Sequence, residues 1–149
     1  MLLLGNFQHS LDDKNRIRLP AKYREKLGNE YIMLPGTHGC ISLYPASAED
    51  KFVRVVNELG EFSAENAETL RMITEMAATV EADSQGRFML PSDLIKFAKI
   101  DKDVRIIGVI DRVEIWSEES YIEWHNGTDR SAKAFDAVNM KIHNAMHKE

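Results

Sequence analysis

Residues 83–91 read DSQGRFMLP, and residues 12–20 of the same chain read DDKNRIRLP. At a constant offset, the opening aspartate, the arginine and the closing Leu-Pro pair of the two strings coincide. Asn15 falls on Gly86, and Asn and Gly are the residue types that best tolerate a positive φ angle. Both strings therefore predict the same feature, which is a tight hairpin turn between two short strands.

Each turn begins with an aspartate and places an arginine directly after its left-handed residue. Asp12 and Asp83 can accept hydrogen bonds from backbone amides two or three residues further on, which fixes the turn. Arg16 and Arg87 are then expected at the tip or rim of a protruding hairpin, where a rigidly held guanidinium can bind phosphate oxygens or the O6 and N7 edge of guanine. The alternative is a plain surface salt bridge, which contributes only about 0–1 kcal/mol.

The repeat extends beyond these strings. In the first copy we expect strands over residues 7–12, 31–36 and 40–45 and helices over 21–28 and 46–60; in the second, strands over 79–83, 104–109 and 112–117 and helices over 92–99 and 117–127. An extra helix is expected from about residue 63 to 78. A unit of this size cannot cover its own apolar face, so the sequence predicts an α+β fold of two halves packed around a pseudo-twofold axis.

The composition is that of a soluble globular protein, with 44% hydrophobic and 29% charged residues in 149. The opening MLLLG lacks the basic flank and cleavage pattern of a signal peptide, so we expect a cytoplasmic protein with no membrane partner. The single cysteine, Cys40, cannot form an internal disulfide and is expected to be structural. No P-loop, GxGxxG or nucleophile elbow is present, so no enzymatic activity, cofactor, metal or small-molecule substrate is expected.

The charge is unevenly distributed. The net charge of −5 argues against a nucleic-acid partner, because Lys and Arg carry most polyanion binding. The segment 12–26 is nevertheless locally basic, with Lys14, Arg16, Arg18, Lys22, Arg24 and Lys26 against Asp12, Asp13 and Glu25. The segment 49–68 is acidic, with Glu49, Asp50, Glu58, Glu61, Glu65 and Glu68 against Lys51 and Arg54. One surface is therefore expected to attract phosphates while another repels them.

The stretches LDDKNRIRLPAKYRE and DSQGRFMLP, with the ISLYP and VEIW segments that follow them, resemble the MraZ family of bacterial transcriptional regulators. The resemblance covers about residues 1–126. It implies a double swapped-hairpin β-barrel of two SpoVT/AbrB-like halves, here 5–48 and 77–120, with linking helices over 49–76 and a helical tail over 127–149. It also implies ring-shaped homo-oligomers in the nucleoid that bind direct repeats in double-stranded DNA, in the promoter of the division and cell-wall gene cluster that includes their own gene.

By motif match, the resemblance assigns DNA contacts to Asp12, Lys14, Asn15 and Arg16 in the first copy and to Asp83, Gly86 and Arg87 in the second. We also expect Arg18 to contact DNA as a phosphate neighbour, and Gln85 to contact it from the second turn. Asn15 stands where the family pattern usually has glycine, so its side chain either alters the turn or supplies a base contact. Lys14 and Arg18 of the first copy correspond to uncharged Gln85 and Met89 of the second. We therefore expect Arg16 to be the principal contact and Arg87 to act more weakly or to stabilise the pseudo-dimer.

Two further interpretations stay open from the sequence. A ring-forming scaffold that binds protein and not DNA would use the same two halves, and its binding would not weaken steeply with added salt. His143 and His147 have a spacing that some metal sites use, but Phe135, Val138, Ile142 and Met146 form a helical stripe in the same tail. The stripe favours a helix that packs or makes an oligomer contact.

Overall fold

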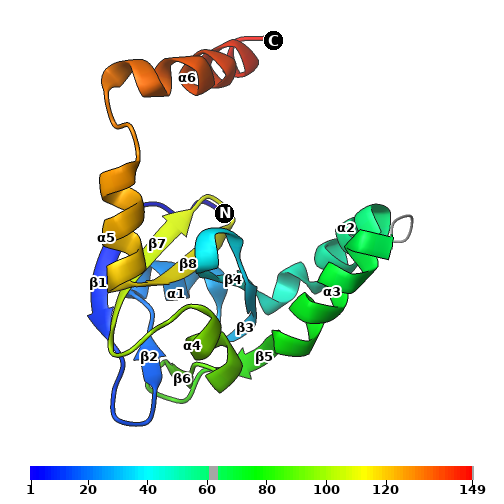
Figure 1. Cartoon of the computed structure of the whole chain (residues 1–149), viewed down its shortest axis with the longest axis vertical. Coiled ribbons are helices and arrows are strands. Elements are labelled where there is room, and N and C mark those ends of the chain that lie inside the picture. The colour runs from blue at the N-terminus through cyan, green and yellow to red at the C-terminus, as the bar shows by residue number, and fades with distance from the viewer. Residues whose placement is uncertain (61–63, 149) are drawn as a thin grey trace.

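The computed structural model describes residues 1–60 and 64–148, so Glu61 of the acidic segment, the expected helix start at Ser63 and the terminal Glu149 lie outside the described residues. The elements follow the repeated order predicted from the sequence (Figure 1). The strands are β1 (Asn6–Ser10), β2 (Arg16–Arg18), β3 (Glu30–Pro35), β4 (Ile41–Pro45), β5 (Ala78–Glu81), β6 (Arg87–Met89), β7 (Asp103–Val109) and β8 (Arg112–Ser117). The helices are α1 (Ala21–Leu27), α2 (Glu49–Gly60), α3 (Ala64–Met76), α4 (Ser92–Phe97), α5 (Glu118–Gly127) and α6 (Ala132–Met146), with short 3₁₀ turns at Thr37–Gly39 and Ala46–Ala48.

Strands from the two copies are interleaved in one sheet. Six of them form one antiparallel sheet in the order β1-β7-β8-β4-β3-β5, and β2 pairs with β6 in a separate antiparallel ribbon. The first strand of the first copy, β1, pairs with β7 of the second, and the first strand of the second copy, β5, pairs with β3 of the first. The order reads the same from either edge when each strand is matched to its equivalent in the other copy. Each copy therefore forms its own central strand pair, β3–β4 or β7–β8, and takes its edge strand from the other copy.

The α+β class is confirmed, but the expected closed barrel is not formed by the hydrogen bonding of the described residues. The six-stranded sheet is open, with β1 and β5 at its edges. The reason lies in β2 and β6, which are only three residues long and leave the sheet through the tight turns that precede them. They pair with each other across the sheet face and do not bridge its two edges.

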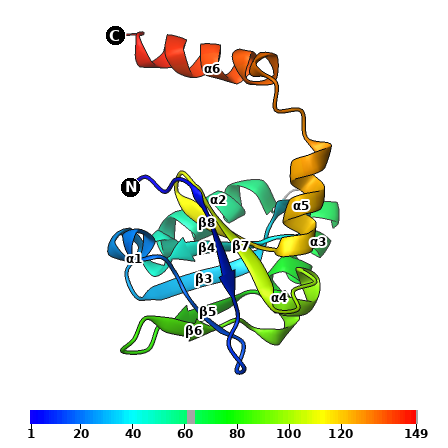
Figure 2. The ribbon, with the colours of Figure 1, turned by 90° about the vertical axis from the view of Figure 1, so that its left-hand side faces the viewer.

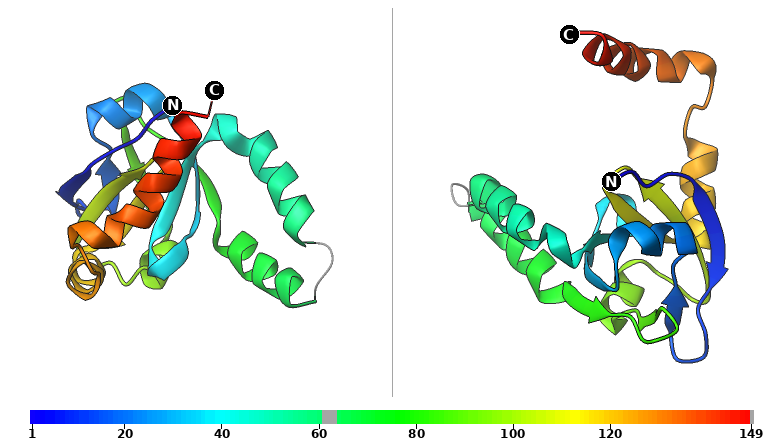
Figure 3. Two further views of the ribbon diagram at one scale, coloured as in Figure 1. Left: turned by 90° about the horizontal axis from the view of Figure 1, so that it is seen from above. Right: turned by 180° about the vertical axis from the view of Figure 1, so that it is seen from behind.

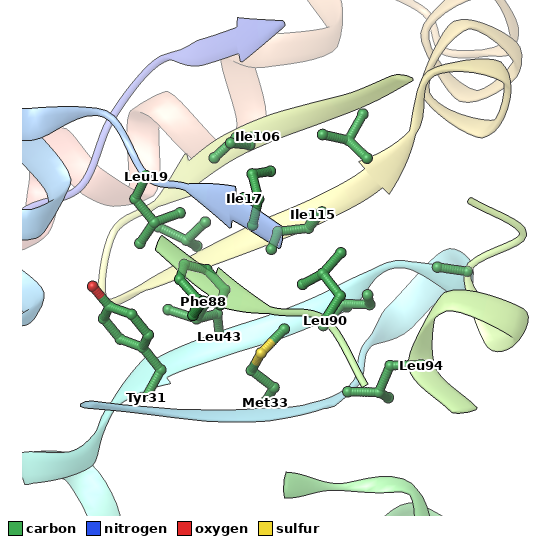
Figure 4. Packing of buried hydrophobic residues seen from close by; sticks show 14 of the residues in the cluster. Ile17, Leu19, Tyr31, Met33, Leu43, Phe88, Leu90, Leu94, Ile106 and Ile115 are labelled. Carbon is green, nitrogen blue, oxygen red and sulfur yellow. The ribbon is translucent and has the colours of Figure 1, made fainter. Parts of the chain in front are cut away.

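The β2–β6 ribbon is anchored by one inward side chain from each strand. Ile17 and Phe88 are paired across the ribbon and are 3% and 2% exposed. Figure 4 shows both among side chains of the large sheet and of α4, including Tyr31, whose ring centroid lies 5.0 Å from that of Phe88. Because side chains alternate along a strand, burial of these residues places their neighbours on the outer face of the ribbon. Figure 2 shows β6 and the strands of the large sheet turned by 90° from the view of Figure 1.

The helices differ in how much of them the body covers. The helices α2 and α3 extend from the body as an arm, and α6 lies apart from the sheet beyond α5 (Figures 1 and 3). The tail is helical as predicted, but its stripe does not pack within the chain, since Phe135, Val138, Ile142 and Met146 are all exposed. No helix among the described residues is both long and apolar enough to cross a membrane.

Cys40 is structural, as expected, and Trp116 is likewise a packing residue. Cys40 is fully buried, and burial raises the pKa of its thiol to about 12, so the thiol stays protonated and unreactive. Trp116 is 4% exposed, packs with Tyr121 and Trp124, and donates a hydrogen bond from Nε1 to Glu114 at 3.1 Å.

Candidate nucleic-acid interface

In the first turn, a single carboxylate organises the backbone. Asp12 Oδ1 accepts hydrogen bonds from the backbone amides of Lys14 at 2.9 Å and Arg16 at 2.8 Å. Its Oδ2 accepts a third from Arg16 Nε at 2.8 Å. Asn15 adopts the predicted positive φ of 58°. The amides bound are those two and four residues on, because the carboxylate reaches across the whole turn to the residue that begins β2.

The second turn repeats this geometry. Asp83 Oδ1 accepts from the amides of Gln85 and Arg87, both at 2.9 Å, and Oδ2 accepts from Arg87 Nε at 3.1 Å. Gly86 has a φ of 80°. Two turns of different sequence thus hold an arginine in the same way.

These bonds keep both carboxylates ionised. The backbone N–H of Arg16 is the main cause that lowers the pKa of Asp12, and the backbone N–H of Arg87 is the main cause that lowers the pKa of Asp83. Each charged carboxylate orients its arginine through Nε alone. Within the described residues, the terminal nitrogens of both guanidinium groups therefore remain available for an anion.

The pairing of β2 with β6 gathers the arginines of the two copies on one face. Arg16 lies opposite Met89, and Arg18 lies opposite Arg87. Like charges placed directly opposite each other on a sheet are destabilising. No described carboxylate forms an ion pair with Arg18, so no acidic side chain of the described residues neutralises its charge. The outer face of the ribbon is thus electrostatically suited to an anionic partner.

Arg24 belongs to the same surface. The sequence places it in the basic segment 12–26 but does not predict it as a site residue. It reaches from α1, and its Nε donates to the backbone oxygen of Leu19 at 3.1 Å. Arg24 lines one surface hollow together with Arg16, Arg18, Arg87 and Asp12, and His9 lies at its side. Burial first, and then the charge of Arg18, lowers the pKa of His9, so this histidine adds little positive charge.

The remaining predicted site residues lie in the turns at the two ends of the ribbon. Lys14 and Asn15 are exposed in the first turn, and Asp83 and Gln85 are exposed in the second. Gly86 differs from its counterpart Asn15 because it is buried. The nine residues predicted to contact DNA thus belong to one continuous feature made of the ribbon and its two turns.

Comparison with known proteins agrees with this arrangement. A family model described as "MraZ protein, putative antitoxin-like" matches the chain twice, over residues 2–72 and 73–140, so that each match contains one of the two turns. The chain belongs to the MraZ family. The resemblance predicted from the two turn motifs is therefore confirmed, and it extends past residue 126 into the tail.

The curated relatives of this MraZ family chain cover nearly its whole length. A "Transcriptional regulator MraZ" of Syntrophomonas wolfei is 39% identical over 130 residues, which is 87% of this chain and 91% of that protein. Proteins of the same name from Clostridium beijerinckii and Natranaerobius thermophilus are 37% and 36% identical, and each alignment spans 95% of this chain and 96% of the relative. The tail and the arm are thus included in the similarity.

Proposed function

We propose that the chain is a sequence-specific DNA-binding transcriptional regulator without catalytic activity. The observation that carries this proposal is one surface hollow lined by Arg16, Arg18 and Arg87 of the β2–β6 ribbon and by Arg24 of α1. The name of the relatives, "Transcriptional regulator MraZ", supports the same role. We propose direct repeats in the promoter of the division and cell-wall gene cluster, including the chain's own gene, as its DNA target, and a cytoplasmic, nucleoid-associated location.

In this proposal the residues of the two turns have separate roles. Arg16 and Arg87, oriented by Asp12 and Asp83, present their terminal nitrogens to guanine edges or to phosphates. Arg18 and the exposed Lys14 bind phosphates, which position the protein without reading sequence. Asn15 and Gln85, exposed in their turns, are placed to add base contacts from the two ends of the ribbon.

The proposal also includes self-association, in which each chain is a pseudo-twofold, swapped-hairpin unit of a closed ring. Exposed apolar side chains on two separate parts of the chain support it: Val53, Val55 and Leu59 on α2, Met72 on α3, and Phe135, Val138, Met140, Ile142 and Met146 on α6. Contacts between unlike surfaces generate rings when the rotation closes. A ring would present the basic ribbon repeatedly, and tethered sites gain affinity through effective concentration, which offsets the net charge of −5.

The proposal is tested by fluorescence anisotropy with duplexes from upstream of the chain's own gene, carrying one or several repeats. Wild-type protein is expected to bind the multi-repeat duplex far more tightly than the single-repeat duplex. The double variant Arg16→Ala/Arg87→Ala should lose specific binding while light scattering shows the same oligomer. Arg71→Ala is the matched control, since Arg71 lies on the arm and its side chain is 74% exposed. Equal affinity for both duplexes would remove the multivalent part of the proposal.

A scaffold that binds protein and not DNA is the second candidate, and the exposed apolar faces of α2 and α6 are the observation that favours it. Salt separates the two candidates. DNA binding should weaken steeply between about 50 and 200 mM salt, whereas an apolar protein interface should not. If the wild type binds no DNA at either salt concentration and still forms a ring, the scaffold is the function to pursue.

A further inference from the structure

The second turn carries a feature that the first lacks. Gly86 is buried and Asn15, its counterpart, is exposed. The atoms nearest to a Cβ built on Gly86 belong to two arginines of the first copy: Arg24 Nη1 at 3.0 Å, and Arg24 Cδ and Arg18 Cδ at 3.3 and 3.4 Å. The arginine side chains of β2 and α1 therefore lie over the backbone of the second turn.

This arrangement depends on the exchange of strands between the copies. Arg18 lies directly opposite Arg87 in the ribbon, and Arg24 lies in the last turn of α1, the helix that follows β2. The equivalents of Arg18 and Arg24 in the second copy are Met89 and Ile95, of which Ile95 packs partly buried against the core. The positions whose arginines lie over the second turn are thus occupied by uncharged residues in the second copy.

The three arginines have few internal partners. Arg87 Nε donates a hydrogen bond to Asp83 in an ion pair, and Arg24 Nε donates one to the backbone oxygen of Leu19. Within the described residues, neither Arg18 nor Arg24 forms an ion pair with a carboxylate. A cluster of this kind is stabilised by an anion with several acceptor oxygens, and a phosphodiester has that chemistry.

The geometry points to a single phosphate-binding site at the second turn, formed by Arg18 and Arg24 of the first copy with Arg87 of the second, that takes one phosphodiester of the DNA backbone. This inference deepens the proposed function and rests on it. Gly86 has two roles in the site: its positive φ forms the turn, and its missing side chain lets Arg24 approach. Arg24 is a binding residue that the repeated motif does not contain.

The first test measures how the affinity of the full-length protein for DNA depends on salt. Removal of one arginine–phosphate pair is expected to reduce the slope of log K against log[salt] by about 0.9 for every protomer on the duplex. Arg24→Gln should show this reduction and weaken binding to specific and unrelated duplexes by the same factor, roughly tenfold. Lys26→Gln is the matched control, because it removes a charge from the same helix where Nζ binds the backbone oxygen of Leu2 at 2.7 Å. Its slope should equal that of the wild type.

The second test exchanges the left-handed residues of the two turns. Gly86→Asn keeps a residue that tolerates a positive φ, as Asn15 does at 58°, but places a side chain against the flexible end of Arg24. Gly86→Asn should reduce the salt slope as Arg24→Gln does. The double variant Arg24→Gln/Gly86→Asn should show no larger reduction in slope than either single variant. The reverse exchange, Asn15→Gly, should leave the salt slope unchanged because Asn15 carries no charge, whatever base contact its side chain makes.

The outcomes separate this inference from the function on which it rests. If the wild type binds neither duplex at any salt concentration, the proposed function is wrong and the phosphate site falls with it. If the wild type binds and Arg24→Gln keeps the full slope, the regulator stands and only the composite site is wrong. A Gly86→Asn protein that binds as the wild type does would likewise overturn the role given to Gly86.

Discussion

The two turns of this chain have the same internal geometry and different surroundings. Asp12 and Asp83 each accept two backbone bonds and one guanidinium bond, at distances between 2.8 and 3.1 Å. Around them, however, Arg16 faces Met89 while Arg87 faces Arg18. The repeated motif thus fixes how an arginine is held, whereas the partner strand decides how much positive charge surrounds it.

The largest expected effect is on the free energy of unfolding, at the two side chains that join the ribbon to the core. Phe88→Ala should destabilise the protein by about 3–5 kcal/mol and Ile17→Ala by about 2–5 kcal/mol, because each leaves a cavity beneath the ribbon. Urea unfolding measures both values. If either change lowers the free energy of unfolding by less than about 1 kcal/mol, the ribbon is not part of the cooperative core.

The next effect concerns DNA affinity and compares the two arginines directly. The motif alone gives Arg16 the larger share, but Arg87 has Arg18 and Arg24 beside it in the folded protein. We therefore expect Arg16→Ala and Arg87→Ala to weaken binding by comparable factors, roughly tenfold or more each. Anisotropy titrations with the multi-repeat duplex measure the ratio. A large decrease for Arg16→Ala with none for Arg87→Ala would show that only the first turn binds DNA.

The smallest effect is on the pH dependence of stability. Because the folded-state pKa of Asp12 and Asp83 is lowered, each carboxylate stabilises the fold above the unfolded pKa of about 3.9, and this contribution is lost as the pH falls through the folded value. Asp12→Asn and Asp83→Asn should each lower the melting temperature at pH 7 by a similar amount. The difference from the wild type should shrink below about pH 4. A difference that stays constant with pH would mean that charge has no part in bracing the turns.

Much of the local structure could be predicted from the sequence, because it depends on residues close together in the chain. The positive φ angles of Asn15 and Gly86, the bracing aspartates and the alternation of strands and helices all follow from residue types at short spacing. The doubled motif also sufficed to identify the family.

The rest depends on contacts between residues far apart in the chain. The position of Arg18 opposite Arg87, and of Arg24 over Gly86, requires knowing that β2 pairs with β6. The open sheet likewise depends on strand partners and not on any local pattern. The apolar spacing in the tail predicts the helix α6, but periodicity does not reveal whether an apolar face is covered by the same chain.

DNA binding by the ribbon is tested most directly by arginine modification with phenylglyoxal, read by mass spectrometry with and without the multi-repeat duplex. We expect DNA to protect Arg16, Arg18, Arg24 and Arg87, which line the ribbon hollow, and to leave Arg54 and Arg71 of the arm as reactive as before. Protection on the arm with none on the ribbon would contradict this expectation, because the DNA would then bind another face.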